Sequence, residues 1–189
     1  IVFMPGSRKS EIKRIFPLFT ELSQKLNDSP KVLVLPIHFA KLSKQELYKI
    51  YGQEIENFSV SFDAVFHLQS CKFAFICSGT ATLQAALLGA PFCLAYTMRK
   101  VEFYIVRAFV HLNVVGLANI LYQAALGQPV GKGEARLHNE YIQDDLSVQN
   151  LLKGYENFNY ETYTKESKKL REYLMQGSSE RIAQILTQS

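Results

Sequence analysis

The feature that most constrains the fold of this chain is an alternation of short apolar runs with helical patterns. Mostly apolar runs of strand length occur at Ile1–Pro5, Lys31–Ile37, Phe58–Phe62, Phe73–Cys77 and Phe92–Tyr96. Strands that are apolar on both faces and separated by helices are typical of a parallel sheet with helices on both sides. The sequence therefore predicts an α/β, Rossmann-like fold with helices on both faces of a parallel sheet.

Apolar residues recur at helical spacing between these runs, although Pro17 interrupts the first pattern and is expected to kink that helix or to mark where its regular part begins. Ser43 is a good N-cap for the second helix. A glycine-rich stretch from Gly116 to Gly133 looks irregular. The predicted helices are Ser7–Leu26, Ser43–Tyr51, Ala64–Gln69, Ala81–Leu88, Arg99–Leu112, Leu146–Tyr155, Tyr160–Met175 and Ser179–Leu186.

Charge and cysteine content exclude some classes of protein. The net charge of +4 is mildly basic, which suits an anionic ligand or a membrane surface, and the chain has no basic stripe with interleaved aromatic residues that would indicate nucleic acid. Cys71, Cys77 and Cys93 lie in apolar segments at spacings that match neither a zinc site nor a redox motif, so we expect buried, reduced thiols. His38, His67, His111 and His138 show no pattern of a catalytic triad or a metal site, so we expect core or surface histidines.

Two glycine-containing turns follow predicted strands and lead into predicted helices. They are Pro5-Gly6-Ser7-Arg8 and Ser78-Gly79-Thr80-Ala81-Thr82. A helix N-terminus offers free N–H groups and partial positive charge, and in a parallel sheet such turns meet at the edge where ligands bind. Each turn alone could be an ordinary helix cap, but the two together predict a phosphate-binding centre to which Arg8 could add a bidentate hydrogen bond.

Five segments resemble conserved segments of the bacterial lipid-A-disaccharide synthase family, in the same order along residues 1 to 150. Residues 5–12 (PGSRKSEI) resemble the family pattern PGSR-x-x-E-(I/V), and residues 78–84 (SGTATLQ) resemble SGTA-x-L-E. Residues 95–98 (AYTM) are similar to its GYR/AYK strand end and residues 115–121 (VGLANIL) to V-x-LPN-(L/I)-(L/I). The fifth match is residues 140–143 (EYIQ), which are similar to E-(L/F)-(L/I)-Q.

The resemblance implies the C-terminal, donor-binding half of a two-domain glycosyltransferase of the GT-B type. It implies catalytic roles for Arg8 and Asn119. Arg8 would contact the phosphate or stabilise the leaving group, and Asn119 would be a polar group of the site. Residues 1–155 would then form the donor-binding domain, and helices within residues 156–189 would pack on it, on the missing half or on a second copy. The residues that it implies for binding the UDP-sugar are Gly6, Ser7, Ser78, Gly79, Thr80, Ala81, Thr82, Gln84, Tyr96, Glu140 and Gln143.

Two positions depart from the family pattern. Gln84 stands where the family usually has Glu, and an amide accepts ribose hydrogen bonds through one oxygen only, whereas a carboxylate accepts through two. Ala118 replaces a Pro before Asn119, which removes a fixed φ from the segment that places this side chain. The first departure thus bears on how the ribose is bound, and the second on how Asn119 is placed.

The implied reaction joins UDP-2,3-diacylglucosamine to 2,3-diacylglucosamine 1-phosphate with inversion, giving a β-1,6-linked disaccharide phosphate and UDP. It implies no cofactor, because the UDP-sugar is a substrate. The chain contains no Asp-x-Asp, so no metal site is predicted. The acceptor-binding N-terminal half and the catalytic base would lie outside this chain, in agreement with its start on the apolar run at Ile1, so we expect the chain alone to bind UDP weakly and to turn over nothing.

The resemblance also implies a cytoplasmic enzyme of a Gram-negative bacterium, with the inner-membrane surface and a second copy of the chain as further candidate partners. The apolar and basic pattern of Arg99–Leu112 fits either a core helix or a helix on a membrane surface. Two other functions stay open. One is a different GT-B UDP-sugar enzyme, either a glycosyltransferase or an epimerase. The other is a non-catalytic nucleotide-binding domain.

Overall fold

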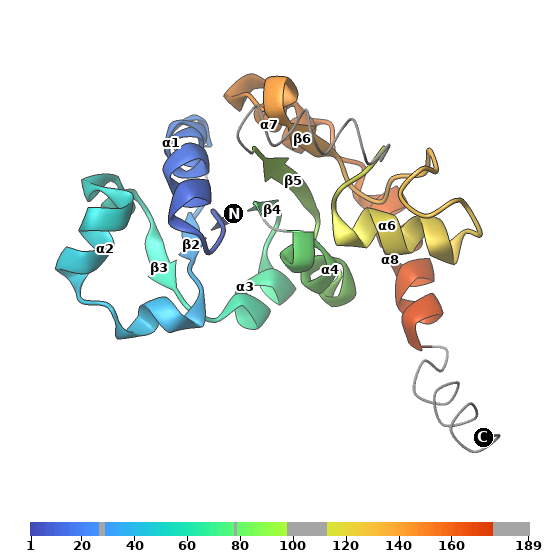
Figure 1. Cartoon of the computed structure of the whole chain (residues 1–189), viewed down its shortest axis with the longest axis horizontal. Coiled ribbons are helices and arrows are strands. Elements are labelled where there is room, and N and C mark those ends of the chain that lie inside the picture. Colours follow the sequence, from blue (N-terminus) through green and yellow to red (C-terminus); the bar gives the residue numbers. More distant parts are fainter. Residues whose placement is uncertain (27–28, 78, 98–112, 176–189) are drawn as a thin grey trace, which may run out of the picture.

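The computed structural model describes residues 1–26, 29–77, 79–97 and 113–175. They form one parallel sheet of six strands in the order β3-β2-β1-β4-β5-β6 (Figure 1). This result confirms the predicted α/β, Rossmann-like class. The strands are β1 (Val2–Met4), β2 (Val32–Val34), β3 (Ser59–Ser61), β4 (Ala74–Ile76), β5 (Phe92–Tyr96) and β6 (Glu140–Ile142).

Helices cover both faces of the sheet. Those on one face include α1 (Lys9–Lys25), α2 (Lys44–Tyr51) and α7 (Val148–Glu156). Those on the other include α3 (Ala64–Ser70), α4 (Gly79–Leu88), α6 (Leu117–Ala125) and α8 (Tyr160–Met175). Figure 1 shows α1 and α7 above the sheet and α3 and α4 below it. Three short 3-10 helices join these elements, η1 (Ile37–Lys41), η2 (Gln53–Asn57) and η3 (Gln143–Asp145).

The pleat of the strands divides the core into two layers. Val2 packs with the α4 side, whereas its neighbour Phe3 packs with the α1 side, because successive side chains of a strand point to opposite faces. Phe3 is fully buried, and its ring centroid lies 5.4 Å from those of Phe19 in α1 and Phe75 in β4. Burial of large aromatic rings on both faces explains why the strands read as continuous apolar runs rather than as alternating ones.

Several predicted boundaries change. Helix α1 runs from Lys9 to Lys25 as a single helix, so the idea that its regular part begins near Pro17 is wrong. Pro17 lies on the exposed side, and burial of the opposite stripe, which includes Ile12 and Phe19, stabilises the helix across it. Ser43 caps α2 as predicted, since its hydroxyl accepts a hydrogen bond from the Glu46 amide.

The stretch from Gly116 to Gly133 is not irregular throughout, because it contains α6, which the sequence pattern did not reveal. Strand β6 was also missed as a strand. The predicted helices at residues 99–112 and 179–186 lie outside the described residues.

Helix α8 packs on the same domain. The Tyr163 hydroxyl donates to the carbonyl of Ala90 at 2.5 Å, and Arg171 donates to the carbonyl of Ala86 at 3.2 Å. Leu170 is fully buried in the same layer. The division of the chain at residue 155 stays a prediction.

Candidate functional site

The site lies where the strand order changes direction. From β1 the chain continues to β2 and β3 on one side, and from β4 it continues to β5 and β6 on the other. In open parallel sheets, ligands bind in the crevice outside the carboxyl ends of the strands at such a switch point. Strands β1 and β4 are neighbours, so the two glycine turns that follow them lie side by side at this edge.

The turn after β1 is built around a glycine that no other residue could replace without strain. Gly6 has φ +95°, and a Cβ there would lie 2.8 Å from Oε2 of Glu11. The Glu11 carboxylate also accepts a hydrogen bond from the guanidinium of Arg8 at 3.1 Å. The Glu11 side chain is 13% exposed and that of Arg8 is 77% exposed, so a largely buried acid anchors a cation that stands in solvent.

The turn after β4 leads directly into α4. The helix begins at Gly79, two residues earlier than predicted, so Thr80 and Ala81 belong to its first turn. Ser78 lies outside the described residues. Thr80 is exposed, whereas Thr82 is fully buried. The free N–H groups and positive end of α4 therefore open beside Gly6 and Ser7.

The two turns line one cavity of about 330 Å³. One wall is polar and contains Ser7, Thr80 and Gln84, and the other is apolar and comes from β2, η1 and the β3–α3 turn. An apolar cleft with a few convergent polar groups is the usual form of a small-molecule site. The residues that line it are Met4, Gly6, Ser7, Val34, Leu35, Pro36, Ile37, Phe62, Ala64, Thr80, Ala81 and Gln84.

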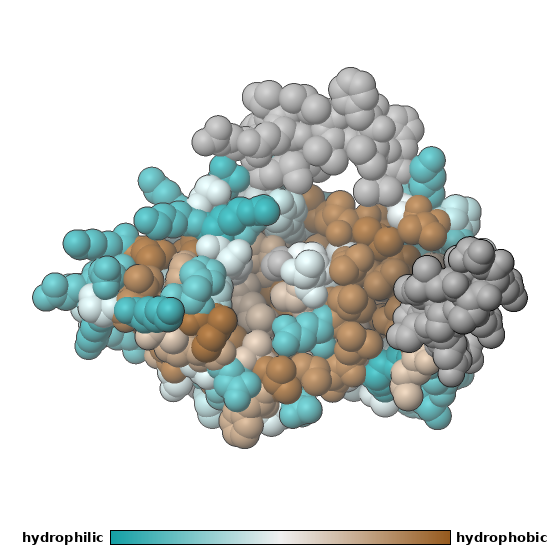
Figure 2. Space-filling view, turned by 60° about the horizontal axis from the view of Figure 1, so that its bottom comes forward, coloured by the Kyte–Doolittle hydropathy of each residue, from teal (hydrophilic) through white to brown (hydrophobic). Residues whose placement is uncertain are grey.

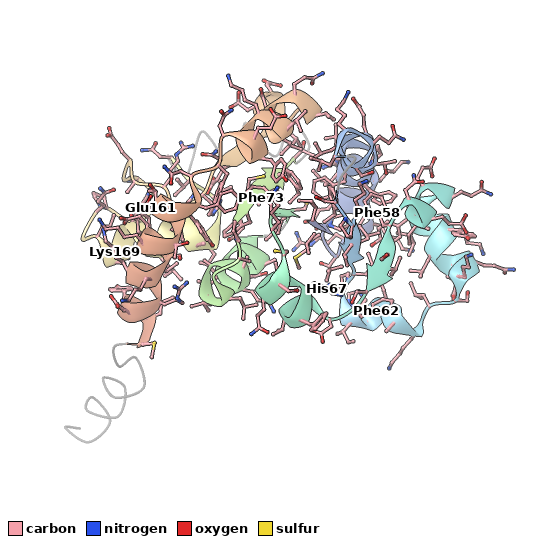
Figure 3. The ribbon with its side chains drawn as sticks, turned by 180° about the vertical axis from the view of Figure 1, so that it is seen from behind. Phe58, Phe62, His67, Phe73, Glu161 and Lys169 are labelled. Atoms are coloured by element: carbon pink, nitrogen blue, oxygen red, sulfur yellow. The ribbon has the colours of Figure 1, made fainter. Side chains whose placement is uncertain are left out.

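A second hollow, of about 570 Å³, adjoins this cavity on the β3 side and shares Gln84, Ile37 and Phe62 with it. Figure 3 shows Phe58 and Phe62 at opposite ends of β3, with Phe62 at the lower edge near His67 of α3. The hollow therefore extends the cavity along the carboxyl ends of the strands. Ser61 and Asp63 add polar groups to its rim.

Apolar side chains are exposed around this edge. Figure 2 shows them gathered in a broad area on the face formed by the bottom of Figure 1, where α3 and α4 lie. The large apolar residues exposed on η1, α3 and α4 are Ile37, Val65, Phe66 and Leu87. The surroundings of the cavity are therefore themselves apolar.

Three predicted site residues use their polar atoms within the protein. Thr82, Asn119 and Glu140 form hydrogen bonds that connect α4, α6 and the segment leading into β6. Thr82 and Asn119 are fully buried and Glu140 is half-buried. None of the three lines the cavity between the two turns, unlike Gly6, Ser7, Thr80, Ala81 and Gln84.

Tyr96 and Gln143 mark the carboxyl ends of β5 and β6. Gln143 has φ +53°, an uncommon backbone conformation for a residue with a side chain that is often found at functional sites. Its Oε1 accepts a hydrogen bond from the Thr97 hydroxyl at 2.7 Å. Tyr96 is half-buried and packs against the α1 layer. The two residues thus lie at the ends of neighbouring strands, β5 and β6, on the far side of β4 from the cavity.

The apolar wall of the cavity was not predicted from the sequence. Leu35, Pro36 and Phe62 read as strand residues, and only their position just after strand ends could have indicated a site. The motif at residues 5–12 does not by itself reveal a role for Glu11, although this residue accepts hydrogen bonds from both the backbone and the side chain of Arg8.

His138 and Cys77 are buried groups, and both are uncharged. Burial lowers the pKa of His138 to about 4, and its ring centroid lies 4.3 Å from that of Phe92. Burial raises the pKa of Cys77 to about 12. His138 is thus a core histidine, as expected, and the Cys77 thiol is chemically quiet. Cys93 is also buried and Cys71 is half-buried, all three being free thiols.

Sequence comparisons show which family this chain resembles. The profile of the family described as "Lipid-A-disaccharide synthetase" matches residues 1–184. The chain is 51% identical over 187 residues to the lipid-A-disaccharide synthase of Helicobacter pylori (strain Shi470), covering 97% of this chain and 51% of the relative. It is 41% identical over 188 residues to that of Campylobacter jejuni (strain RM1221), covering 48% of the relative. The chain spans about half the length of the curated relatives it matches.

Proposed function

This chain belongs to the lipid-A-disaccharide synthase family, and we propose that it is the donor-binding portion of an inverting glycosyltransferase. The proposed reaction joins UDP-2,3-diacylglucosamine to 2,3-diacylglucosamine 1-phosphate. The observation that carries the proposal is the cavity between the two glycine turns at the switch point of the sheet. Its polar wall can hold a diphosphate and its apolar wall a base.

The diphosphate would bind at the positive end of α4. The N–H groups of the first turn lie at this end of the helix, Thr80 lines the cavity, and Gly79 would let the phosphate approach the backbone. Arg8 is exposed and paired with Glu11 at the adjoining turn, and we propose that its guanidinium turns toward the same anion. The site would thus offer donors from two elements to one diphosphate.

The nucleoside would extend toward β3. Gln84 lines both the cavity and the adjoining hollow, so it can hydrogen-bond a ribose between a phosphate at Thr80 and a base beyond it. Ile37 and Phe62 offer the base an apolar wall, and Ser61 lies at the polar rim. Ser78, Tyr96 and Gln143 remain proposed contacts of the donor.

In the reaction, a hydroxyl of the acceptor attacks the anomeric carbon from the face opposite the diphosphate. The bond from this carbon to the diphosphate oxygen breaks, and both electrons leave with UDP. The α4 N-terminus and Arg8 stabilise the negative charge that builds up on the leaving group. The acceptor proton passes to a base that we place in the remainder of the protein, outside this chain.

Calorimetry of the full-length protein with UDP, UMP and uridine tests the site. We expect UDP to bind at least tenfold more tightly than uridine, on the order of 1.4 kcal/mol or more from contacts to the diphosphate. Failure of UDP to bind at millimolar concentration would contradict the proposal. Turnover with acylated but not with plain UDP-N-acetylglucosamine would separate this activity from that of other UDP-sugar enzymes.

Location and partners are also proposals. Among the described residues, no helix has the length and apolar character needed to cross a bilayer. We propose that the protein works at the cytoplasmic surface of a bacterial inner membrane, because its substrates are acylated. The acceptor-binding half and a second copy of the chain are further proposed partners. Measuring the binding of the full-length protein to anionic vesicles tests the membrane contact.

A further inference from the structure

The side chain of Asn119 is fully buried and all of its polar atoms are used. Its Oδ1 accepts hydrogen bonds from the backbone amides of Leu137 and His138, at 2.7 and 3.1 Å. Its Nδ2 donates to the carbonyl of His138 at 3.0 Å and to Oε1 of Glu140 at 2.8 Å. A buried amide with four such partners has no free hydrogen-bonding group to offer to a ligand.

The carboxylate of Glu140 fills the N-terminus of α6. Its Oε2 accepts from the amide of Val115 at 2.8 Å, and its Oε1 accepts from the amide of Gly116, the N-cap, at 2.9 Å. A carboxylate at this place satisfies free N–H groups and neutralises the positive end of the helix. The N-termini of α4 and α6 lie next to each other at this edge. The N-terminus of α6 is therefore already occupied by an anion of the protein, the Glu140 carboxylate.

Thr82 connects this cap to α4. Its buried hydroxyl donates to the carbonyl of Gly79 at 2.5 Å and accepts from the amide of Ala118 at 3.3 Å. The first residue of α4 also lies against the same segment, since a Cβ on Gly79 would be 3.7 Å from the carbonyl oxygen of Val115. The first turns of α4 and α6 are thus held together by one hydrogen-bond network.

We infer that Glu140, Asn119 and Thr82 are positioning residues, which set the place of the α4 N-terminus and act on the donor through it. The inference rests on the proposed function, because it assumes that the diphosphate binds at α4. Two consequences follow from the geometry. Loss of the Glu140 carboxylate frees the segment at residues 115–118 that supports Gly79. It also opens the α6 N-terminus as a competing place for an anion.

The test is a double-mutant cycle on UDP binding to the full-length protein, with Glu140→Gln and Thr82→Val as the two changes. Glu140→Gln replaces one acceptor oxygen by an NH2 group that cannot accept from the Val115 amide. Thr82→Val keeps the shape of the side chain and removes the hydrogen bond between the Thr82 hydroxyl of α4 and the Ala118 amide of α6. We expect each change to weaken UDP binding about tenfold. The double variant should weaken it by clearly less than the product of the two single factors, because both changes act through the α4 N-terminus.

Tyr163→Phe is the matched control. It removes a buried hydrogen bond to the backbone carbonyl of Ala90, which precedes β5 and so lies at the opposite end of the sheet. We expect it to lower the melting temperature by a few degrees with no change in UDP affinity, and its effects to add to those of Glu140→Gln. All affinities are measured well below the melting temperature of each variant.

The outcomes separate the alternatives. If Glu140 contacts the donor directly, the losses from Glu140→Gln and Thr82→Val multiply, and the inference is wrong. If both variants melt earlier but bind UDP as the wild type does, the network only stabilises the fold, and the inference is also wrong. If Glu140→Gln does not fold, Thr82→Val with unchanged UDP affinity still overturns it. Absence of UDP binding by the wild type contradicts the proposed function instead.

Discussion

The two turns at the switch point carry the same kind of sequence but depend on glycine for different reasons. Gly6, after β1, has φ +95°, and a Cβ there would meet the Glu11 carboxylate at 2.8 Å. Gly79, after β4, lies in the helix, and its nearest neighbour from such a Cβ is the Val115 carbonyl at 3.7 Å. The backbone itself requires the first glycine, whereas the described residues around the helix leave room for a methyl group at the second. We therefore propose that Gly79 serves the approach of a ligand.

Removal of Arg8, the cation on the first turn, should have the largest effect on the rate of sugar transfer. Replacing Arg8 by Ala removes a guanidinium that is largely exposed, so the free energy of unfolding should hardly change. The rate of sugar transfer should fall by about 100-fold, since a preorganised donor to the leaving group is lost. Steady-state kinetics of the full-length enzyme measure this. Lys9→Ala, an exposed cation one residue further on, is the control and should stay near the wild-type rate.

Gly6→Ala tests the backbone requirement of the first turn. A non-glycine residue at this φ costs about 1–3 kcal/mol, and the Glu11 carboxylate must move away as well. We expect a melting temperature lower by several degrees together with weaker UDP binding, measured by calorimetric scanning and titration. A variant as stable as the wild type would show that the turn accepts an ordinary residue and would remove the distinction between the two glycines.

Gly79→Ala is the converse test. Alanine is a better helix former than glycine, and the nearest described atom outside the neighbouring residues and backbone of α4 would lie 3.7 Å from its methyl group, so stability should be unchanged or slightly higher. UDP binding should weaken by about tenfold, or 1.4 kcal/mol, because the methyl group stands in the path of the phosphate. Loss of stability without loss of affinity would mean that Gly79 serves the packing of α4 and not a ligand.

An element of the fold could be predicted from the sequence where its own residues carry a clear apolar pattern. The runs at Phe73–Cys77 and Phe92–Tyr96 are buried on both faces, so their composition alone predicts central strands. Strand β6 has three half-buried residues, and α6 sits in a glycine-rich stretch, so neither has a clear local pattern.

Both elements are held by contacts between distant residues, such as the hydrogen bonds of Asn119 with Leu137 and His138. The same holds for the candidate site. The turn glycines could be predicted because a turn is local, whereas the apolar wall at Leu35 and Phe62 depends on how three strands end together.

Gln84 gives the smallest expected effect and bears on how far the site extends beyond the two turns. It lies one helical turn after Thr80 and lines both the cavity and the adjoining hollow, where a ribose would bind. Gln84→Glu supplies a second acceptor oxygen, so we expect UDP to bind about threefold more tightly, or 0.6 kcal/mol, in the range of a single modest hydrogen bond. With 2′,3′-dideoxy-UDP, which has no ribose hydroxyls to donate, the gain should vanish, and the added negative charge should weaken binding instead. An equal gain for both ligands would show that residue 84 acts on something other than the ribose and would limit the site to the two turns.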